Sequence, residues 1–254
     1  MTLVLLHGFL GLPESWNEML AALPSGQRIV RPTLLGHGAA DPDSRSRVET
    51  FEDEVERLAE RLAEERIGRA HVVGYSMGAR VALVLTERHP ELVSELTMIS
   101  GSAGLDDPDE RRARAIADDR LAEQLRAEGL PAFVRNWEAL PLFATQQKLS
   151  PGARARHRAR RLAHQDALVA HALSTLSPGR MPALTKRLGS IEVPVSLIAG
   201  SLDPKFTGIA RSIAPLFPRA RVRILDGAGH DPCLERPREL AALMNEDVLT
   251  QSAT

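Results

Sequence analysis

Residues 74–78 read Gly-Tyr-Ser-Met-Gly, which places a serine between two glycines at a fixed spacing. An apolar run at 70–73 precedes this motif, and a run typical of a helix follows it. In that context Gly-x-Ser-x-Gly indicates a nucleophile elbow, a sharp turn that exposes the serine at the end of a strand. The amino terminus of the following helix also offers backbone N–H groups to an anion. Ser76 is therefore the candidate reactive group, with an ordinary tight turn as the alternative.

A serine hydroxyl reacts only when a histidine takes its proton and an acid orients that histidine. On sheets that carry such an elbow, the chain order is serine, acid, histidine. Asp203 follows a late apolar run and His230 follows the next one, so both should lie near the serine. We predict Asp203 as the orienting acid and His230 as the base. Asp226 is the competing acid, but it lies only four residues before His230.

Two backbone N–H groups should form the oxyanion hole beside the serine, those of Met77 and of a residue in the loop after the first strand. That loop reads His-Gly-Phe-Leu-Gly at 7–11, and Phe9 is its expected donor. We interpret His7, and His37 in Leu35-Gly36-His37-Gly38, as structural residues that pack these loops.

Three further histidines raise the question of a metal site. His157, His164 and His171 are spaced seven residues apart. On one helix each step would be about 10.5 Å, which is too long for the histidines to share one ion. We expect no metal and no cofactor.

The elements that must position these residues alternate along the chain. Short apolar runs between helical stretches are typical of buried parallel strands. The helix expected at 51–65 has one apolar face and begins with a capping box of Thr50 and Asp53. The expected strands are Thr2–Leu6, Arg28–Val30, Ala70–Val73, Leu96–Ile99, Val193–Ala199 and Arg221–Leu225.

About ninety residues after the fourth expected strand contain no strand candidate. We interpret residues 105–188 as a helical cap over the carboxyl ends of the strands, where open parallel sheets bind ligands. Residues 1–104 and 189–254 then form the core. Residues 101–190 hold thirteen arginines and two lysines against six aspartates and four glutamates. This basic insert could attract a small anion, or it could be a solvated, salt-bridged helical face.

Composition excludes several classes of function. The 254 residues are 43% hydrophobic and 26% charged, which is ordinary for a globular protein. A net charge of -1 argues against a nucleic-acid partner, and the apolar run at 3–6 is too short for a membrane span. The single cysteine, Cys233, cannot form an intrachain disulfide, and we expect a cytoplasmic protein.

Together these residues resemble the α/β-hydrolase fold, with a mostly parallel sheet of about six strands and a helical cap after the fourth. More narrowly, the chain resembles the 2-succinyl-6-hydroxy-2,4-cyclohexadiene-1-carboxylate synthase family of menaquinone biosynthesis. The motifs that carry this resemblance are Leu6-His7-Gly8-Phe9-Leu10-Gly11, Pro32-Thr33-Leu34-Leu35-Gly36-His37-Gly38, Gly74-Tyr75-Ser76-Met77-Gly78-Ala79-Arg80, the cap residues Arg111, Arg114, Asp118, Trp137, Pro141-Leu142-Phe143 and Arg161, then Asp203-Pro204-Lys205-Phe206 and Gly229-His230.

The resemblance implies a carbon–oxygen lyase that eliminates pyruvate from a polycarboxylate cyclohexene substrate without a cofactor. His230, oriented by Asp203, would activate Ser76 to remove a proton from a substrate carbon. The expected substrate-binding residues are Tyr75, Arg80, Arg114, Trp137 and Arg161. Arg80 lies one helical turn after Ser76, where an arginine would suit a carboxylate ligand.

Two segments depart from the family pattern. His164-Gln165-Asp166 replaces a stretch that usually contains asparagine and proline, and Asp231-Pro232-Cys233 stands where a second histidine is frequent.

Two alternatives to the lyase remain open on the sequence. One is a carboxylic-ester hydrolase that uses the same triad through an acyl-enzyme, which a mostly apolar pocket would favour. The other is a non-catalytic ligand receptor of the same fold.

Overall fold

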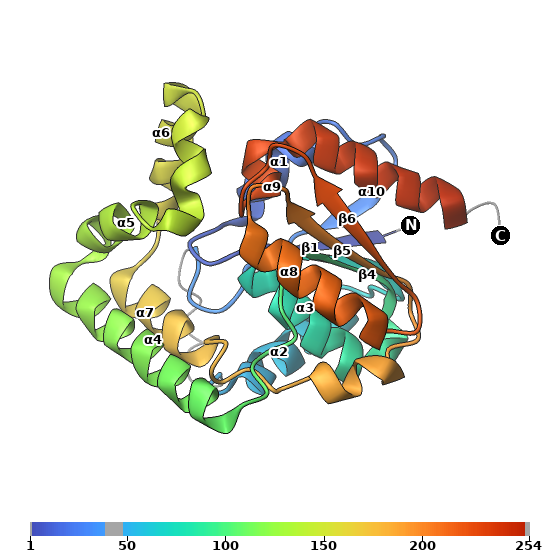
Figure 1. The fold of residues 1–254 in the computed structure, drawn as a ribbon, viewed down its shortest axis with the longest axis horizontal. Coiled ribbons are helices and arrows are strands. Elements are labelled where there is room, and N and C mark those ends of the chain that lie inside the picture. The colour runs from blue at the N-terminus through green and yellow to red at the C-terminus, as the bar shows by residue number, and fades with distance from the viewer. Residues whose placement is uncertain (1, 39–47, 252–254) are drawn as a thin grey trace.

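Six short runs form one parallel sheet in the computed structural model, which describes residues 2–38 and 48–251. The strand order is β2-β1-β3-β4-β5-β6, and every neighbouring pair is parallel. The sheet of six parallel strands predicted from the sequence is therefore confirmed (Figure 1). The strands are β1 Thr2–Leu6, β2 Arg28–Val30, β3 Ala70–Tyr75, β4 Val93–Ile99, β5 Val195–Gly200 and β6 Ala220–Leu225.

Helices cover both faces of the sheet because its strands are apolar on both sides. In β1, Leu3 and Leu5 pack toward α1 and α10, whereas Val4 and Leu6 pack toward α2 and α3. The core helices are α1 Asn17–Leu20, α2 Phe51–Glu64, α3 Met77–Arg88, α8 Pro204–Ile213, α9 Pro232–Glu235 and α10 Pro237–Gln251. Short 3-10 turns join them at η1 Pro13–Trp16, η2 Pro90–Leu92, η4 Thr185–Ser190 and η5 Ala214–Leu216.

Helix α2 begins as the sequence predicts. The Thr50 hydroxyl accepts a hydrogen bond from the Asp53 amide at 3.1 Å, and Asp53 accepts one from the Thr50 amide at 2.8 Å. This capping box satisfies two of the amides that an α-helix leaves without partners at its start. The apolar face of the helix, which includes Phe51, Val55 and Leu58, is fully buried.

The insert between β4 and β5 contains no strand in the structure, as expected. Its helices are α4 Pro108–Glu128, α5 Leu130–Glu138, α6 Pro151–Arg161 and α7 Asp166–Thr175, with the 3-10 stretch η3 Pro141–Lys148. We call these elements the cap. They lie beside the carboxyl ends of the strands and enclose a small hydrophobic cluster of their own, which includes Leu125, Phe133 and Val169 (Figure 1).

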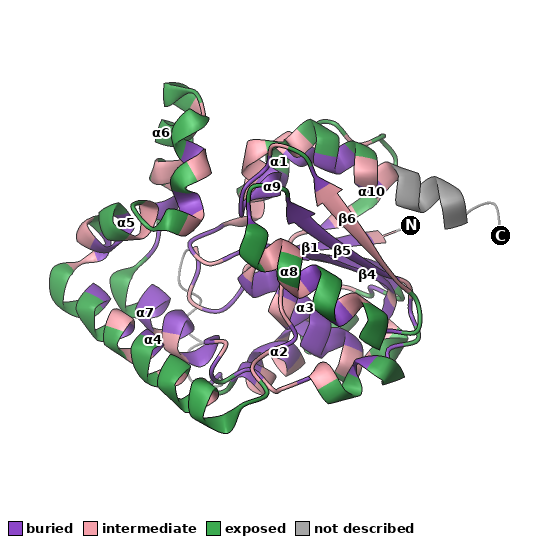
Figure 2. Cartoon of the chain, in the orientation of Figure 1, coloured by how far each residue is buried: buried purple, intermediate pink, exposed green. Residues whose placement is uncertain are grey.

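The cap is much less buried than the sheet. The outer faces of α4 and α6 are exposed over most of their length, whereas the strands are buried apart from the outer β2 and β6 (Figure 2). In α6 the only buried residue is Arg161. Several cap arginines form ion pairs, for example Arg180 with Asp119 at 2.7 Å and Arg158 with Glu138 at 3.0 Å. Some of the arginines that make the insert basic are therefore paired with acidic side chains at the surface of the cap.

No helix in the described part of the chain is long and apolar enough to cross a membrane.

Candidate active site

Ser76 stands at the turn between β3 and α3 with φ 51°, a left-handed conformation that a serine rarely adopts. The flanking glycines make this turn possible. A Cβ atom at Gly74 would collide with the backbone of Gly78 and Ala79, and one at Gly78 would collide with the carbonyl of Leu6. The close packing of β3, α3 and β1 therefore requires both glycines. This arrangement is the strained elbow that the motif predicts.

His230 and Asp203 reach Ser76 from the loops after β6 and β5. Ser76 Oγ lies 3.2 Å from His230 Nε2, and His230 Nδ1 lies 2.8 Å from Asp203 Oδ2. Both Asp203 and His230 are buried, and the second oxygen of Asp203 accepts a hydrogen bond from the Phe206 amide. The three side chains thus form the hydrogen-bonded chain expected of a triad.

The competing acid lies elsewhere. Asp226 is exposed and accepts a hydrogen bond from the Ser201 hydroxyl at 3.1 Å. The structure therefore brings Asp203, and not Asp226, to His230.

The two residues expected to supply the oxyanion hole, Phe9 and Met77, both border the same cavity as Ser76. Met77 begins α3, and Phe9 lies in the loop after β1. Neither amide donates a hydrogen bond to another described residue, which leaves both available to a substrate oxygen. Glycines bring the loop close, because a Cβ atom at Gly8 would lie 2.7 Å from the Tyr75 ring.

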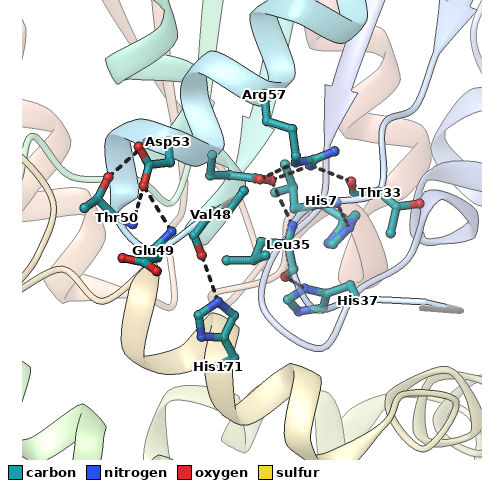
Figure 3. A network of polar contacts seen from close by, with 12 residues as sticks. His7, Thr33, Leu35, His37, Val48, Glu49, Thr50, Asp53, Arg57 and His171 are labelled. Carbon is teal, nitrogen blue, oxygen red and sulfur yellow. Dashed lines mark hydrogen bonds and ion pairs between the residues drawn. The ribbon is translucent and has the colours of Figure 1, made fainter. Parts of the chain in front are cut away.

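His7 and His37 hold the surrounding loops, as expected for structural residues. His7 Nε2 accepts a hydrogen bond from the Leu34 amide (Figure 3). His37 Nε2 accepts one from the Leu10 amide. Burial lowers the pKa of His7 to about 4 and that of His37 well below its usual range. Both rings are therefore neutral near pH 7, which lets each ring accept a hydrogen bond from a backbone amide.

A cavity of about 400 Å³ opens above Ser76 between the core and the cap. Nine of the ten residues that the sequence proposes for the site border this cavity, and the tenth, Asp203, contacts it only through its hydrogen bond to His230. Its volume lies within the range of small-molecule sites.

Arg80 borders this cavity from the first turn of α3. Its guanidinium donates a hydrogen bond to the Leu176 carbonyl at 2.7 Å. It forms no ion pair with any described residue. Burial lowers the pKa of Arg80 to about 9, the nearby Arg114 adds to the decrease, and Asp118 opposes it. The group is still a cation at pH 7.

Two cap arginines border the same cavity, and each already contacts an acid. Arg114 Nε donates to Asp118 at 2.8 Å, and Asp118 also accepts from the Ser177 hydroxyl at 2.6 Å. Arg161 is buried and bonds to Glu138 at 3.1 Å and to Gln146 at 3.2 Å. These contacts hold the two guanidinium groups in place.

Trp137 and Tyr75 combine packing with pocket lining. The Trp137 ring stacks on Phe133 inside the cap and meets the Phe9 ring edge-on at 5.1 Å. The ring centroids of Tyr75 and His230 lie 5.7 Å apart. Burial raises the pKa of the Tyr75 hydroxyl well above its usual range. Both side chains border the cavity, so neither is only core.

The structure adds pocket residues that the sequence does not single out as site residues. His157, Arg160 and Lys205 bring further polar groups, and Asp231 and Cys233 come from the segment that departs from the family pattern. Burial raises the pKa of Asp231 to about 6. In the sequence, Lys205 could have been identified as a pocket residue because it lies two positions after Asp203. For His157 the sequence offers only its seven-residue spacing from His164. No group of three potential ligands in the described ranges could hold a metal ion.

Comparison with known proteins gives consistent matches. The model of the α/β-hydrolase fold family matches residues 2–237. A Bacillus subtilis (strain 168) protein, to which the name 2-succinyl-6-hydroxy-2,4-cyclohexadiene-1-carboxylate synthase is given provisionally, is 36% identical over 96% of this chain and 88% of its own. The synthase of that name from Enterobacter sp. (strain 638) is 31% identical over 95% of this chain and 89% of its own. Among solved structures, MenH from S. aureus matches 99% of this chain and 94% of its own, with a TM-score of 0.93 and 29% identity.

Proposed function

The chain belongs to the α/β-hydrolase family, and we propose that it is a carbon–oxygen lyase. It would form 2-succinyl-6-hydroxy-2,4-cyclohexadiene-1-carboxylate by eliminating pyruvate, a step of menaquinone biosynthesis. Arg80 is the observation that carries this proposal. Arg80 borders the cavity one helical turn from Ser76, and its guanidinium has no acidic partner of its own among the described residues. A neutral ester has no need of a cation there, whereas a polycarboxylate does.

The substrate-binding proposal rests on three cations around one cavity. Arg80 supplies a charge from the core, and Arg114 and Arg161 supply charges from the cap. A guanidinium carries five N–H donors. Arg114 and Arg161 therefore keep donors for a ligand after bonding to Asp118 and Glu138. Trp137 and Tyr75 would pack against the ring of the substrate.

The proposed reaction begins with proton removal. His230 Nε2 takes the Ser76 proton while Ser76 Oγ takes the proton of the ring carbon that bears the succinyl group. The electron pair of that C–H bond forms a new ring double bond, the existing double bond shifts, and the bond from the ring to the enolpyruvyl oxygen breaks. The proton on His230 then passes to the departing enolpyruvate, which becomes pyruvate. Ser76 and His230 return to their starting states, and no acyl-enzyme is formed.

The oxyanion hole has a defined part in this scheme. Removing a proton beside the succinyl ketone places negative charge on the ketone oxygen. The amides of Phe9 and Met77 would receive that oxygen, as such donors do for the oxyanion in acyl transfer. The same geometry would stabilise an ester's tetrahedral intermediate, so weak hydrolysis of a small ester is expected alongside the lyase reaction.

A kinetic isotope effect tests the proposal. The enolpyruvyl substrate is prepared with deuterium or hydrogen on the ring carbon that bears the succinyl group, and pyruvate release is followed under single-turnover conditions. Proton abstraction from carbon predicts a clear primary isotope effect on this release. A neutral p-nitrophenyl ester, which needs no such step, is the control reaction. No release of pyruvate, with ester hydrolysis intact, would contradict the lyase and favour the carboxylic-ester hydrolase.

A further inference from the structure

Leu10, the residue after the proposed oxyanion donor Phe9, belongs to the core and the cap at once. Its backbone lies in the loop after β1, whereas its side chain is buried in the hydrophobic cluster of the cap with Phe133, Val134 and Val169. Its φ of 58° is left-handed, which costs a residue with a Cβ about 1–2 kcal/mol. The surrounding contacts must therefore hold this conformation.

His37 holds Leu10 from the core side. The Leu10 amide donates to His37 Nε2 at 3.0 Å, and His37 Nδ1 donates to the Leu35 carbonyl at 2.7 Å, which fixes the ring in one tautomer. The segment that carries His37 is anchored on α2. Buried Glu54 accepts a hydrogen bond from the Leu35 amide, and Arg57 pairs with Glu54 and donates to the Thr33 carbonyl (Figure 3).

His164 reaches the same place from the cap. Its Nδ1 accepts a hydrogen bond from the Gly38 amide at 3.1 Å, and its ring meets the His37 ring edge-on at 5.1 Å. The ring proton must then sit on Nε2, which is buried and has no hydrogen-bond partner among the described residues. Burial lowers the pKa of His164, and the Leu10 backbone opposes this decrease. The cap also packs closely against the segment that carries His37, because a Cβ atom at Gly36 would collide with the Leu168 carbonyl in α7.

We propose that His164 is a positioning residue that couples the docked cap to the oxyanion hole through Gly38, His37 and Leu10. When the cap is in place, these contacts set the backbone of Leu10 and so the direction of the neighbouring Phe9 amide. This inference rests on the oxyanion role proposed for Phe9. It assigns a role to one of the residues at which the chain departs from the family pattern.

The test compares two cap histidines. His171 is the matched control, because it too bonds a single backbone group of the core, the Val48 carbonyl at 2.9 Å, but does not contact Leu10 or His37 (Figure 3). We expect His164→Ala to lower kcat about 5- to 20-fold with KM within about twofold, since misplaced oxyanion donors weaken transition-state binding. His171→Ala should change kcat by less than about twofold. In His164→Asn the side-chain carbonyl can still accept from the Gly38 amide, so most of kcat should return.

A second readout needs no catalysis. The Leu10 amide resonance in a ¹H–¹⁵N spectrum should shift in His164→Ala and stay in place in His171→Ala. If His164→Ala does not fold, His164→Phe, which fills the site without the polar contacts, should show the same loss of kcat and the same shift.

Each rate is measured on both the enolpyruvyl substrate and the p-nitrophenyl ester, so that the two proposals fail separately. If the lyase reaction is absent, a fall in kcat for ester hydrolysis in His164→Ala but not in His171→Ala still supports the coupling. Equal kcat values for the His164 and His171 variants, with an unshifted Leu10 amide, would overturn the coupling and leave the lyase proposal untouched.

Discussion

The core and the cap contribute to the same cavity by different physical means. In the core, Ser76, His230 and Asp203 stand at the ends of buried strands, and glycines that admit no Cβ atom shape the turn around the serine. In the cap, the cationic groups sit on partly exposed helices and are held by ion pairs. The reactive geometry thus depends on backbone packing, and the charge that selects a ligand depends on side-chain pairs.

This difference has consequences for tolerance to change. A buried elbow cannot be altered without moving two strands and a helix, because interiors are close-packed. Ion pairs between exposed side chains, such as Arg180 with Asp119, contribute less than about 1 kcal/mol each and can be replaced singly. Substrate choice can therefore vary on the cap while the chemistry stays fixed in the core.

Ser76→Ala should have the largest effect and tests the core alone. We expect kcat/KM to fall by about 10⁴-fold or more on both the enolpyruvyl substrate and the ester, because both reactions use the same activated oxygen. Steady-state rates on the two substrates measure it. Survival of the lyase rate with loss of ester hydrolysis would mean that His230 removes the carbon proton directly.

Acid should destabilise the core through its neutral histidines. Burial lowers the pKa of His71 to about 4, as it does for His7, against 6.5 for an exposed ring. The folded state binds fewer protons, so this stability is complete above about pH 6.5 and is lost as the pH falls toward 4. Each histidine should cost about 2 kcal/mol of unfolding free energy at pH 5. Urea unfolding at pH 7 and pH 5 measures the sum.

His71→Gln is the matched variant for this pH effect. The amide can still bond to the Thr97 hydroxyl, which His71 meets at 2.8 Å, but it does not titrate. The difference in unfolding free energy between the two pH values should shrink by about 2 kcal/mol. An unchanged difference would show that His71 is not a source of the acid sensitivity.

Arg80→Ala should separate the charge that binds a ligand from the chemistry. Losing a charged partner in a partly desolvated site costs about 2–3 kcal/mol, or roughly 30- to 150-fold in kcat/KM on the polycarboxylate substrate. The neutral ester should be almost unaffected. Arg88→Ala is the control, since Arg88 ends the same helix on the surface and pairs with Glu56. Equal losses on both substrates in Arg80→Ala would mean that this arginine only supports the fold.

Glu18→Gln should have the smallest effect and tests the outer contacts of the cap. Glu18 pairs with Arg156 at 3.8 Å and Arg160 at 4.0 Å, both long contacts between α6 and the core. We expect a change in unfolding free energy below about 1 kcal/mol and little change in kcat/KM. Glu138→Gln, which removes the acid bonded to the buried Arg161, should weaken substrate binding more. A tenfold loss of kcat/KM in Glu18→Gln would show that α6 depends on these contacts.

The sheet, the elbow and the order of the three reactive residues can be predicted from local patterns in the sequence. Strand character is a local property of short apolar runs, and Gly-x-Ser-x-Gly is local because the turn needs both glycines within five residues. The choice of Asp203 over Asp226 also rests on spacing along the chain, since Asp226 lies only four residues before His230, and in the structure His230 bonds to Asp203.

The contacts between the cap and the core depend on packing between distant parts of the chain. The arginine pattern of α6 does not reveal that Arg161 is buried on Glu138 while Arg156 stays in solvent, because helix periodicity gives a face and not the partner it finds. The contacts of His164 with Gly38 and His37 join residues more than 120 positions apart in the chain. Such contacts depend on the packing of separate elements, which local spacing does not encode.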